Sequence, residues 1–565
     1  MTTFTDIEQQ FRQHILSDPF TNMELGATDF LGQLGDPSLA SEQKHIDQAK
    51  ALLASIEQTS SEDFDESLDL ELMTLDLKRA IFFHELQQHD QPQRRRRPGG
   101  VDGISAGIFQ LFVNDNRSAS ARLDNIVSRL QQAPEYLAIE RQVVSQPITR
   151  WMQVELEQGE GIPDFLDTIY AWAKQENYAS LAELENAIDQ CKQALTEYLT
   201  DISSRPTIDD FSIGEDKVNE LLALRQIYKT PSELAQMAKQ FMLETQQLLN
   251  DLTTKLAAKY DLPSDTNQEQ LHTFLNEQFA APLKNGDLDS ILDYYHEQIQ
   301  GIETFIQKNQ LFPLPKQQKM TILKTPSFLE PVIPAGAMWP PLALREGSKD
   351  SMVYLTLKHD QLSEHTLLGI PVMMIHEGIP GHHLQLASAA LHPSFVRRIF
   401  SANEHAEGWT TMLEDYMLDI GYIGDELVDE ARFIAKREMT RLVARVGIDL
   451  YFMTNNKAYL DMGLELNYDS EDVFENAAKL LKAATGFTDG RVQAELNWYS
   501  MEQGYPLSYL TGNRLVWQLK TDIQQANKKQ LTPLELDRAF HDVYVNSGCM
   551  PVESLRKVFA HYGYL

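Results

Sequence analysis

The chain has 565 residues, of which 42% are hydrophobic and 9% aromatic, so it is long and apolar enough to bury a large core. Its 49 Lys and Arg residues against 82 Asp and Glu residues give a formal net charge of −33. Such a surface repels phosphate backbones and anionic lipids, which argues against nucleic-acid and peripheral-membrane partners. The composition therefore favours a soluble enzyme.

The N-terminus and the cysteines predict a cytoplasmic protein without a disulfide framework. The first eight residues contain neither the basic nor the apolar segment of a signal peptide. No apolar run approaches the roughly 18–20 residues of a membrane span. Cys191 and Cys549 lack the spacing of a metal site, and we expect both to be ordinary buried thiols.

Residues 1–310 predict an N-terminal helical scaffold. Apolar residues recur at helical spacing in three segments: 42–57, 69–84 and 118–132. Pro134 is expected to end or kink the third helix. The four arginines at 94–97 are flanked by Pro and Gly, and we interpret them as a solvent-exposed loop.

Capping patterns mark further helix starts. Capping boxes or their Thr-Pro variants occur at three places: 180–183, 230–233 and 532–535. The helix after Thr230 is expected to run to about Lys259, and one capped by Ser470 is expected to close at Gly486. Each pattern predicts a defined helix end.

Residues 311–565 are predicted to form the region that holds the site, continuous with the scaffold. Prolines cluster at its start, with strand-like pieces at 320–323 and 352–357. The second piece is expected either to be an edge strand that pairs with an extended peptide or to belong to a structural hairpin. The fold is therefore predicted to be mainly α, with a small β element before the metal helix.

The segment from His376 to Gln385, HEGIPGHHLQ, carries three imidazoles and one carboxylate directly after an apolar run. Two neutral imidazoles that hold a metal, with a Glu as general base, are the chemistry of zinc hydrolases. In the usual His-Glu-x-x-His motif, the i,i+4 step places both ligands on one helix face. Here Gly381-His382 comes two residues late, with Pro380 in between. The sequence predicts a zinc site on a modified helix.

The second histidine ligand remains open between His382 and His383. On a regular helix His376 and His383 share a face. Pro380 cannot donate to the carbonyl of His376 and its ring pushes that turn outward, which favours a bulged or interrupted helix. Because a bulge can bring His382 round to the metal, His382 is the preferred ligand.

A third ligand and an orienting carboxylate are expected on the next helix. A catalytic zinc site needs three protein ligands and one open position. Glu407 follows His382 after enough residues for a helix to end, turn and return. Glu414 lies two turns beyond Glu407 on the same face, where it can orient a ligand. Such a His₂Glu set also tolerates cobalt or manganese.

These residues resemble the family known as bacterial domain of unknown function 885. The resemblance rests on His376-Glu377, Pro380-Gly381-His382-His383-Leu384-Gln385, Glu407-Gly408-Trp409 and Tyr509-x-x-Gly512, and more loosely on 26–30, 36–38 and 122–126. It implies a large two-lobed helical body with a central cleft, similar to angiotensin-converting enzyme, thimet oligopeptidase and carboxypeptidase Taq. It also implies His376, His382 and Glu407 as ligands of one zinc ion and Glu377 as the base.

The resemblance implies a zinc-dependent peptidase that acts on oligopeptides. Glu377 takes a proton from water and passes it to the leaving amine in this hypothesis. Tyr509, or alternatively Tyr505, donates to the developing oxyanion. A buried core tyrosine is the competing interpretation for either one.

Two departures from the family pattern favour an alternative function. The family's Asp-x-Gly-(Leu/Ile)-His is here Arg445-Val446-Gly447-Ile448-Asp449, and its Pro-Gly-Gln is here Gln503-Gly504-Tyr505. If the replaced groups are needed, the chain is a catalytically impaired or inactive helical protein that binds a peptide or another ligand, with a vestigial metal site. Hydrolysis of a non-peptide amide or ester is a third hypothesis.

Overall fold

The computed structural model describes residues 3–88, 95–325, 336–359, 362 and 365–565. The chain forms two compact units, Met1–Phe211 and Ser212–Leu565. The division between them therefore falls well before the change of composition at residue 311. Residues 215–309 belong to the second unit because their helices pack on one another and on the later helices at 369–377 and 428–454.

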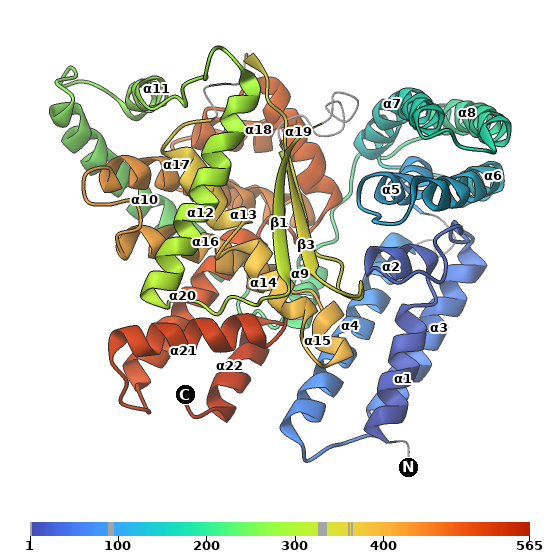
Figure 1. Cartoon of the computed structure of the whole chain (residues 1–565), viewed down its shortest axis with the longest axis horizontal. Helices are drawn as coiled ribbons and strands as arrows, with labels where there is room; N and C mark the ends of the chain where they lie inside the picture. Colours follow the sequence, from blue (N-terminus) through green and yellow to red (C-terminus); the bar gives the residue numbers. More distant parts are fainter. Residues whose placement is uncertain (1–2, 89–94, 326–335, 360–361, 363–364) are drawn as a thin grey trace. The chain divides into compact units, whose positions relative to one another are not determined.

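The first unit is helical throughout its described part (Figure 1). Its helices are α1 (Phe4–Ile15), α2 (Pro19–Glu24), α3 (Leu39–Ile56), α4 (Phe64–Gln88), α5 (Gly100–Val113), α6 (Ala119–Val143), α7 (Thr149–Gln175) and α8 (Leu181–Ser203). The three helices predicted from apolar spacing are present as α3, α4 and α6, and α6 packs along α8. Cys191 is a buried free thiol on α8, as expected.

Three local predictions in this unit differ from the structure in whole or in part. Pro134 does not end α6, which continues to Val143 and packs on α5 and α8. Ser180 makes no side-chain cap, since its φ and ψ of −95° and 39° are not the extended conformation that capping needs. Arg95 is not a solvated loop residue, because it pairs with the buried carboxylate of Glu140 at 2.7 Å. Arg94 lies outside the described residues.

Glu155 on α7 is a buried carboxylate that holds the start of α5. It accepts hydrogen bonds from Val101 N (2.8 Å) and from the Tyr198 hydroxyl (2.9 Å). Burial raises the pKa of Glu155 to about 7, although both hydrogen bonds lower it. The folded protein therefore binds this proton more tightly than the unfolded chain does.

The stability that Glu155 contributes is expected to fall with rising pH. Because its folded pKa lies above the unfolded value of about 4.3, the free energy of unfolding decreases between these two values, by at most about 1.4 kcal/mol per pH unit. Glu155→Gln removes this slope. Urea unfolding at pH 5 and pH 7.5 should show the variant gaining stability relative to the natural protein at the higher pH. If the free energies of unfolding of the variant and the natural protein differ by the same amount at both pH values, the raised pKa of Glu155 is contradicted.

The second unit combines helices with one small sheet. Its helices before the sheet are α9 (Glu215–Leu224), α10 (Pro231–Lys259), α11 (Gln268–Gln278), the 3₁₀ helix η1 (Leu288–Ser290) and α12 (Ile291–Asn309). Those after it are α13 (Gly369–Glu377), α14 (His382–Ala390), α15 (Phe395–Ile399), α16 (Asn403–Asp419), α17 (Val428–Thr454), η3 (Lys457–Leu460), α18 (Val473–Thr485), α19 (Asp489–Met501), α20 (Ser508–Ala526), α21 (Pro533–Asn546) and α22 (Val552–His561).

Helix ends in this unit follow the capping patterns closely. Thr230 and Thr532 both form full capping boxes, and α10 ends at Lys259 as predicted. Gly486 closes α18 in the left-handed conformation. The N-cap of α18 is Asp472 rather than the predicted Ser470. The error is small because Ser470 instead hydrogen-bonds the backbone N of that cap residue.

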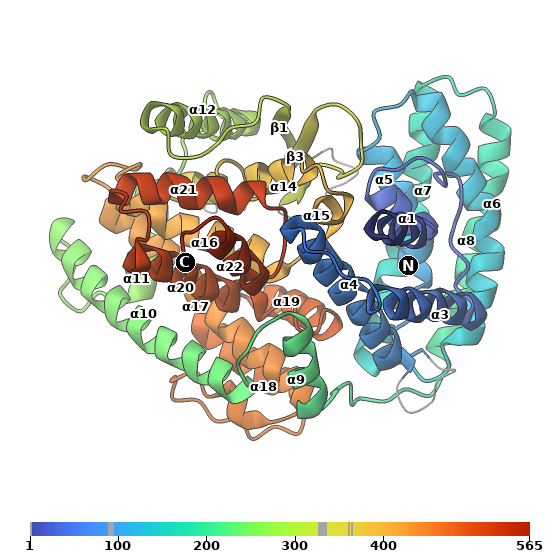
Figure 2. The same ribbon diagram turned by 90° about the horizontal axis from the view of Figure 1, so that it is seen from below.

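The sheet has the order β1-β3-β2, with β1 (Gln318–Lys324) parallel to β3 (Lys349–Leu355) and β2 (Gly336–Trp339) antiparallel to it. Both views show α12 beside β1 (Figures 1 and 2). The predicted strand at 352–357 is present as β3, but it is the central strand. Residues 352–355 are paired on both sides, so this stretch offers no open edge to a peptide.

The core of the second unit lies around α16, α17 and α20, which pack on one another. From Thr440 to Met453 almost every side chain of α17 is buried. The fold is mainly helical with a small sheet before the candidate metal helix, which confirms the predicted class. In the described part of the chain, no helix is both long and apolar enough to cross a bilayer.

Candidate metal centre

The histidine-rich segment forms two short helices rather than one. Helix α13 ends at Glu377 and α14 begins at His382, so the interruption predicted at Pro380 is confirmed. The Ile379–Pro380 peptide bond is cis, and Trp409 Nε1 donates to the carbonyl of Pro380 at 2.9 Å. A Cβ on Gly381 would lie 1.9 Å from the carbonyl oxygen of His376, so only glycine fits there. The turn therefore requires glycine at position 381.

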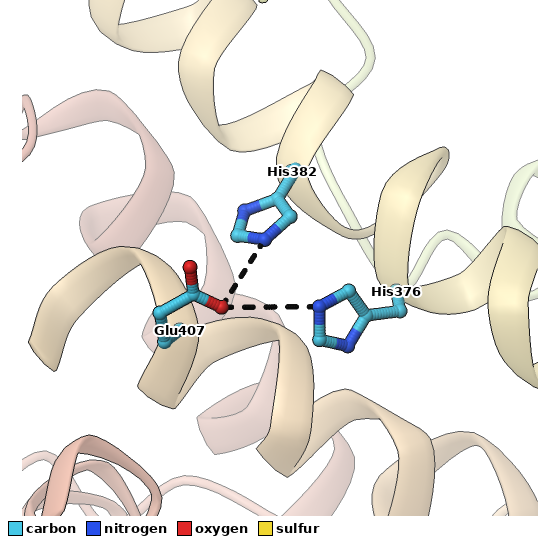
Figure 3. Close-up of side chains that lie close together, drawn as sticks. All are labelled: His376, His382 and Glu407. Atoms are coloured by element: carbon cyan, nitrogen blue, oxygen red, sulfur yellow. Dashed lines mark ion pairs between the residues drawn. The ribbon is translucent and has the colours of Figure 1, made fainter. Parts of the chain in front are cut away.

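His376, His382 and Glu407 come together across this turn (Figure 3). Glu407 Oε2 lies 3.4 Å from His382 Nε2 and 3.9 Å from His376 Nε2. One ligand atom from each residue lies within 4.8 Å of the other two. The imidazoles are 18% and 13% exposed, which leaves them accessible from solvent. The structure thus joins the three residues that the sequence singled out as metal ligands.

The three side chains fit a tetrahedral metal ion. Metal–ligand bonds of 2.0–2.2 Å in a tetrahedral site separate the ligand atoms by roughly 3.3–3.6 Å. The two separations from Glu407 Oε2 lie close to this range. Among the described residues Oε2 has no hydrogen-bond partner of good geometry, although it is fully buried. A buried carboxylate oxygen aimed between two imidazoles is what a His₂Glu metal site requires.

Glu414, two turns beyond Glu407 on α16, lies against His376. His376 Nδ1 lies 2.7 Å from Glu414 Oε1, which leaves Nε2 free to face Glu407. Burial lowers the pKa of His376, but the hydrogen bond to Glu414 and the nearby carboxylates raise it overall to about 9. A carboxylate behind a ligand histidine fixes its tautomer and its ring orientation.

The surroundings of the imidazoles are rich in negative charge. Glu377, Glu414 and Glu407 all act on His376 electrostatically. Burial raises the pKa of Glu407, but His382 and His376 lower it overall to about 2, so this carboxylate is ionised. Three carboxylates beside two imidazoles favour a bound cation, either protons on the rings or a metal ion in their place.

His383 lies away from the other two histidines. It is fully buried, with Nδ1 2.6 Å from Ser351 Oγ on β3 and Nε2 hydrogen-bonded to Gln318 on β1. Burial lowers the pKa of His383 to about 4, so the ring is neutral. The structure therefore brings His382 to Glu407 and uses His383 to attach α14 to the sheet.

The two candidate tyrosines take different places. The Tyr505 hydroxyl donates to Glu407 Oε1 at 2.9 Å. Tyr509 lies next to it, with ring centroids 5.8 Å apart, and the guanidinium of Arg445 lies 4.4 Å from the Tyr509 centroid. Tyr505, the less favoured residue in the sequence, is therefore the one in direct contact with the group of three.

Both residues that depart from the family pattern are bonded within the site region. Arg445 donates to the Tyr499 hydroxyl at 2.8 Å and pairs with Glu495 at 3.1 Å. Asp449 accepts from the backbone N of Gly504 and of Leu507, each at 3.0 Å. Sequence reasoning missed these contacts, because residue spacing holds no signal for partners fifty or more positions away.

Fold and site together define a mainly helical protein with a candidate mononuclear His₂Glu metal centre. The chain matches the model of the family described as "Bacterial protein of unknown function (DUF885)" over residues 19–558, and it belongs to this family. Comparison with the curated proteins finds no match.

Two solved structures share this fold over their whole length. A "putative lipoprotein of unknown function" from Shewanella oneidensis superposes with a TM-score of 0.77 at 19% identity, covering 99% of this chain and 100% of its own. A "putative lipoprotein" from Colwellia psychrerythraea has a TM-score of 0.77 at 16% identity, covering 100% of this chain and 99% of its own. At these identities the comparison establishes the fold alone.

The cytoplasmic location predicted from the first residues is wrong by this comparison. Both similar structures are described as putative lipoproteins, and this description of those two proteins contradicts a cytoplasmic location. The prediction failed because it relied on a missing signal segment, whereas the start of the given sequence carries no information about what precedes it.

Proposed function

We propose that this protein is a zinc-dependent hydrolase that cleaves oligopeptides. The observation that carries the proposal is the convergence of His376, His382 and Glu407, with Glu414 behind His376 and Glu377 beside it. These are the ligand types and the number of ligands of a catalytic zinc site, which keeps one position open. When bound, zinc supplies Lewis-acid chemistry that polarises a carbonyl and lowers the pKa of water to about 7.

Two of the protein's own side chains are assigned the roles of general base and oxyanion donor. Glu377, adjacent in the chain to His376 and half-buried, accepts the proton of the attacking water and returns it to the leaving amine. Tyr509, close to Tyr505 and to Arg445, is the candidate donor to the oxyanion. The intact set of ligands and base favours an active hydrolase over the alternative of a vestigial site, even with Arg445 and Asp449 in place of the family residues.

Zinc analysis combined with a substrate screen tests the proposal. The protein purified without chelators should bind one zinc ion per chain and hydrolyse members of an oligopeptide library. Chelation should abolish this hydrolysis and added zinc should restore it. If no zinc can be loaded stoichiometrically, the hydrolase proposal fails. Zinc without any cleavage would favour the ligand-binding alternative, and cleavage of amides or esters but of no peptide would replace the substrate class.

A further inference from the structure

The two oxygens of the Glu407 carboxylate have different neighbours. Oε1 accepts a hydrogen bond from the Tyr505 hydroxyl at 2.9 Å. Oε2 faces the Nε2 atoms of His382 and His376 at 3.4 and 3.9 Å (Figure 3). The carboxylate is only 7% exposed, so water does not compete freely for either oxygen. One oxygen is thus held by the protein and the other is presented to the space between the imidazoles.

Tyr505 is placed by a tight turn between α19 and α20. Tyr505 N donates to Glu502 O, and Ser508 N donates to Tyr505 O, each at 2.9 Å. Asp449, which is fully buried on α17, binds this turn through both carboxylate oxygens: Oδ1 accepts from Gly504 N and Oδ2 from Leu507 N. Two backbone hydrogen bonds to one carboxylate fix the turn against α17 on both sides of Tyr505.

Arg225 binds the same turn and connects it to α16. It donates to the carbonyl of Gly504 and forms an ion pair with Glu404, and the two charged side chains are 9% and 4% exposed. Glu404 lies one helical turn before Glu407 on α16. Gly504 has a φ of +83°, and a Cβ there would lie 2.7 Å from Leu221, so this position requires glycine. Arg225 thereby links the turn to the helix that carries Glu407.

We propose that Tyr505 is a positioning residue that holds Glu407 as a ligand through Oε2, and that Asp449 supports it by fixing the turn. A carboxylate without this hydrogen bond can rotate, and either oxygen can then face the imidazoles. Partners that hydrogen-bond a metal-binding carboxylate typically change metal affinity by about 10–100-fold. The inference rests on the proposed metal site, and it explains why Asp occupies position 449 in this chain.

Tyr505→Phe tests the positioning role directly, since it removes only the hydroxyl. The zinc dissociation constant, measured by competition with a chromophoric chelator, should rise by about 10–100-fold. The visible spectrum of the cobalt-loaded variant should also differ from that of the natural protein, because a carboxylate that binds through different oxygens changes the ligand field. Neither readout depends on hydrolysis.

Tyr260→Phe is the matched control. The Tyr260 hydroxyl donates to the buried carboxylate of Glu430 at 2.7 Å. The substitution therefore removes the same kind of hydrogen bond, from tyrosine to a buried glutamate, at a place away from the histidines. This variant should leave the zinc dissociation constant unchanged within about twofold. If Tyr505→Phe binds zinc as tightly as the control does, the positioning role is overturned while the metal site stands. If the unmodified protein binds no zinc, the proposed function itself fails.

Asp449→Asn tests the support of the turn. Asn can accept one of the two backbone N–H groups, but its NH₂ group cannot accept the other. Zinc affinity should fall, as it does for Tyr505→Phe. The double variant should bind zinc about as weakly as the weaker single variant, because both substitutions act through the Tyr505–Glu407 hydrogen bond. Circular dichroism establishes that the variant is folded. A folded Asp449→Asn protein with unchanged zinc affinity, or additive losses in the double variant, would remove Asp449 from the proposal.

Discussion

Glu377→Gln is expected to keep zinc at one ion per chain and to lose peptide hydrolysis by about 10²–10⁴-fold, the range typical of a general base. Gln has nearly the same shape as Glu but cannot accept and return a proton near neutral pH. Glu377 is not one of the three residues, His376, His382 and Glu407, that form the candidate ligand group. Zinc content by elemental analysis and turnover of a peptide found in the library screen measure the two effects separately.

Glu465→Gln is a suitable control for the lost charge, because Glu465 is exposed in the same unit and far along the chain from the motif. It should retain full zinc and full turnover. Hydrolysis by Glu377→Gln at the rate of this control would show that another group is the base. If Glu377→Gln also loses zinc, Glu377 either binds the metal or stabilises α13.

His382→Ala is expected to lose zinc affinity, whereas His383→Ala is expected to lose stability. Removing His382 takes away one of the three ligands. Zinc affinity should therefore fall by more than about 100-fold, the upper end of the loss caused by mutating a residue that only hydrogen-bonds a ligand. Removing His383 should leave zinc binding nearly intact and lower stability. Its partner Ser351 on β3 is left unsatisfied in a fully buried place, at about 1–3 kcal/mol, and the partly buried Gln318 on β1 also loses its hydrogen bond.

Zinc titration and thermal unfolding of both variants separate these effects. We expect weak zinc binding with near-normal stability of the metal-free protein for His382→Ala, and the reverse for His383→Ala. The pair controls for itself, because the two residues are adjacent and the substitution is the same. Loss of zinc in His383→Ala with full retention in His382→Ala would reverse the assignment of the second ligand.

Local patterns in the sequence predicted much of the helical framework. Apolar spacing identifies α3, since the same positions, among them Ile46 and Leu52, are buried in the structure. Thr230 and Thr532 mark helix starts because a cap is a short-range interaction within four residues. Pro134 does not end its helix, because packing of a long helix on its neighbours outweighs the loss of one backbone hydrogen bond.

The motif also contained the chemistry of the candidate site. The sequence by itself determined which residue types are available, that Pro380 interrupts the helix, and that Glu407 and Glu414 share a face of the next helix. These conclusions hold because ring geometry and helical periodicity are properties of the chain alone. The same reasoning made Glu414 a candidate to orient a ligand, and the structure places it beside His376.

Only the tertiary structure decided which neighbour in each pair reaches the site. His382 rather than His383 faces Glu407 because Ser351 and Gln318, on strands far back in the chain, bind His383. Tyr505 rather than Tyr509 contacts Glu407 because Asp449 fixes its turn. Where a helix is interrupted or a turn begins, periodicity no longer sets the direction of a side chain. Partners brought close by folding then set it.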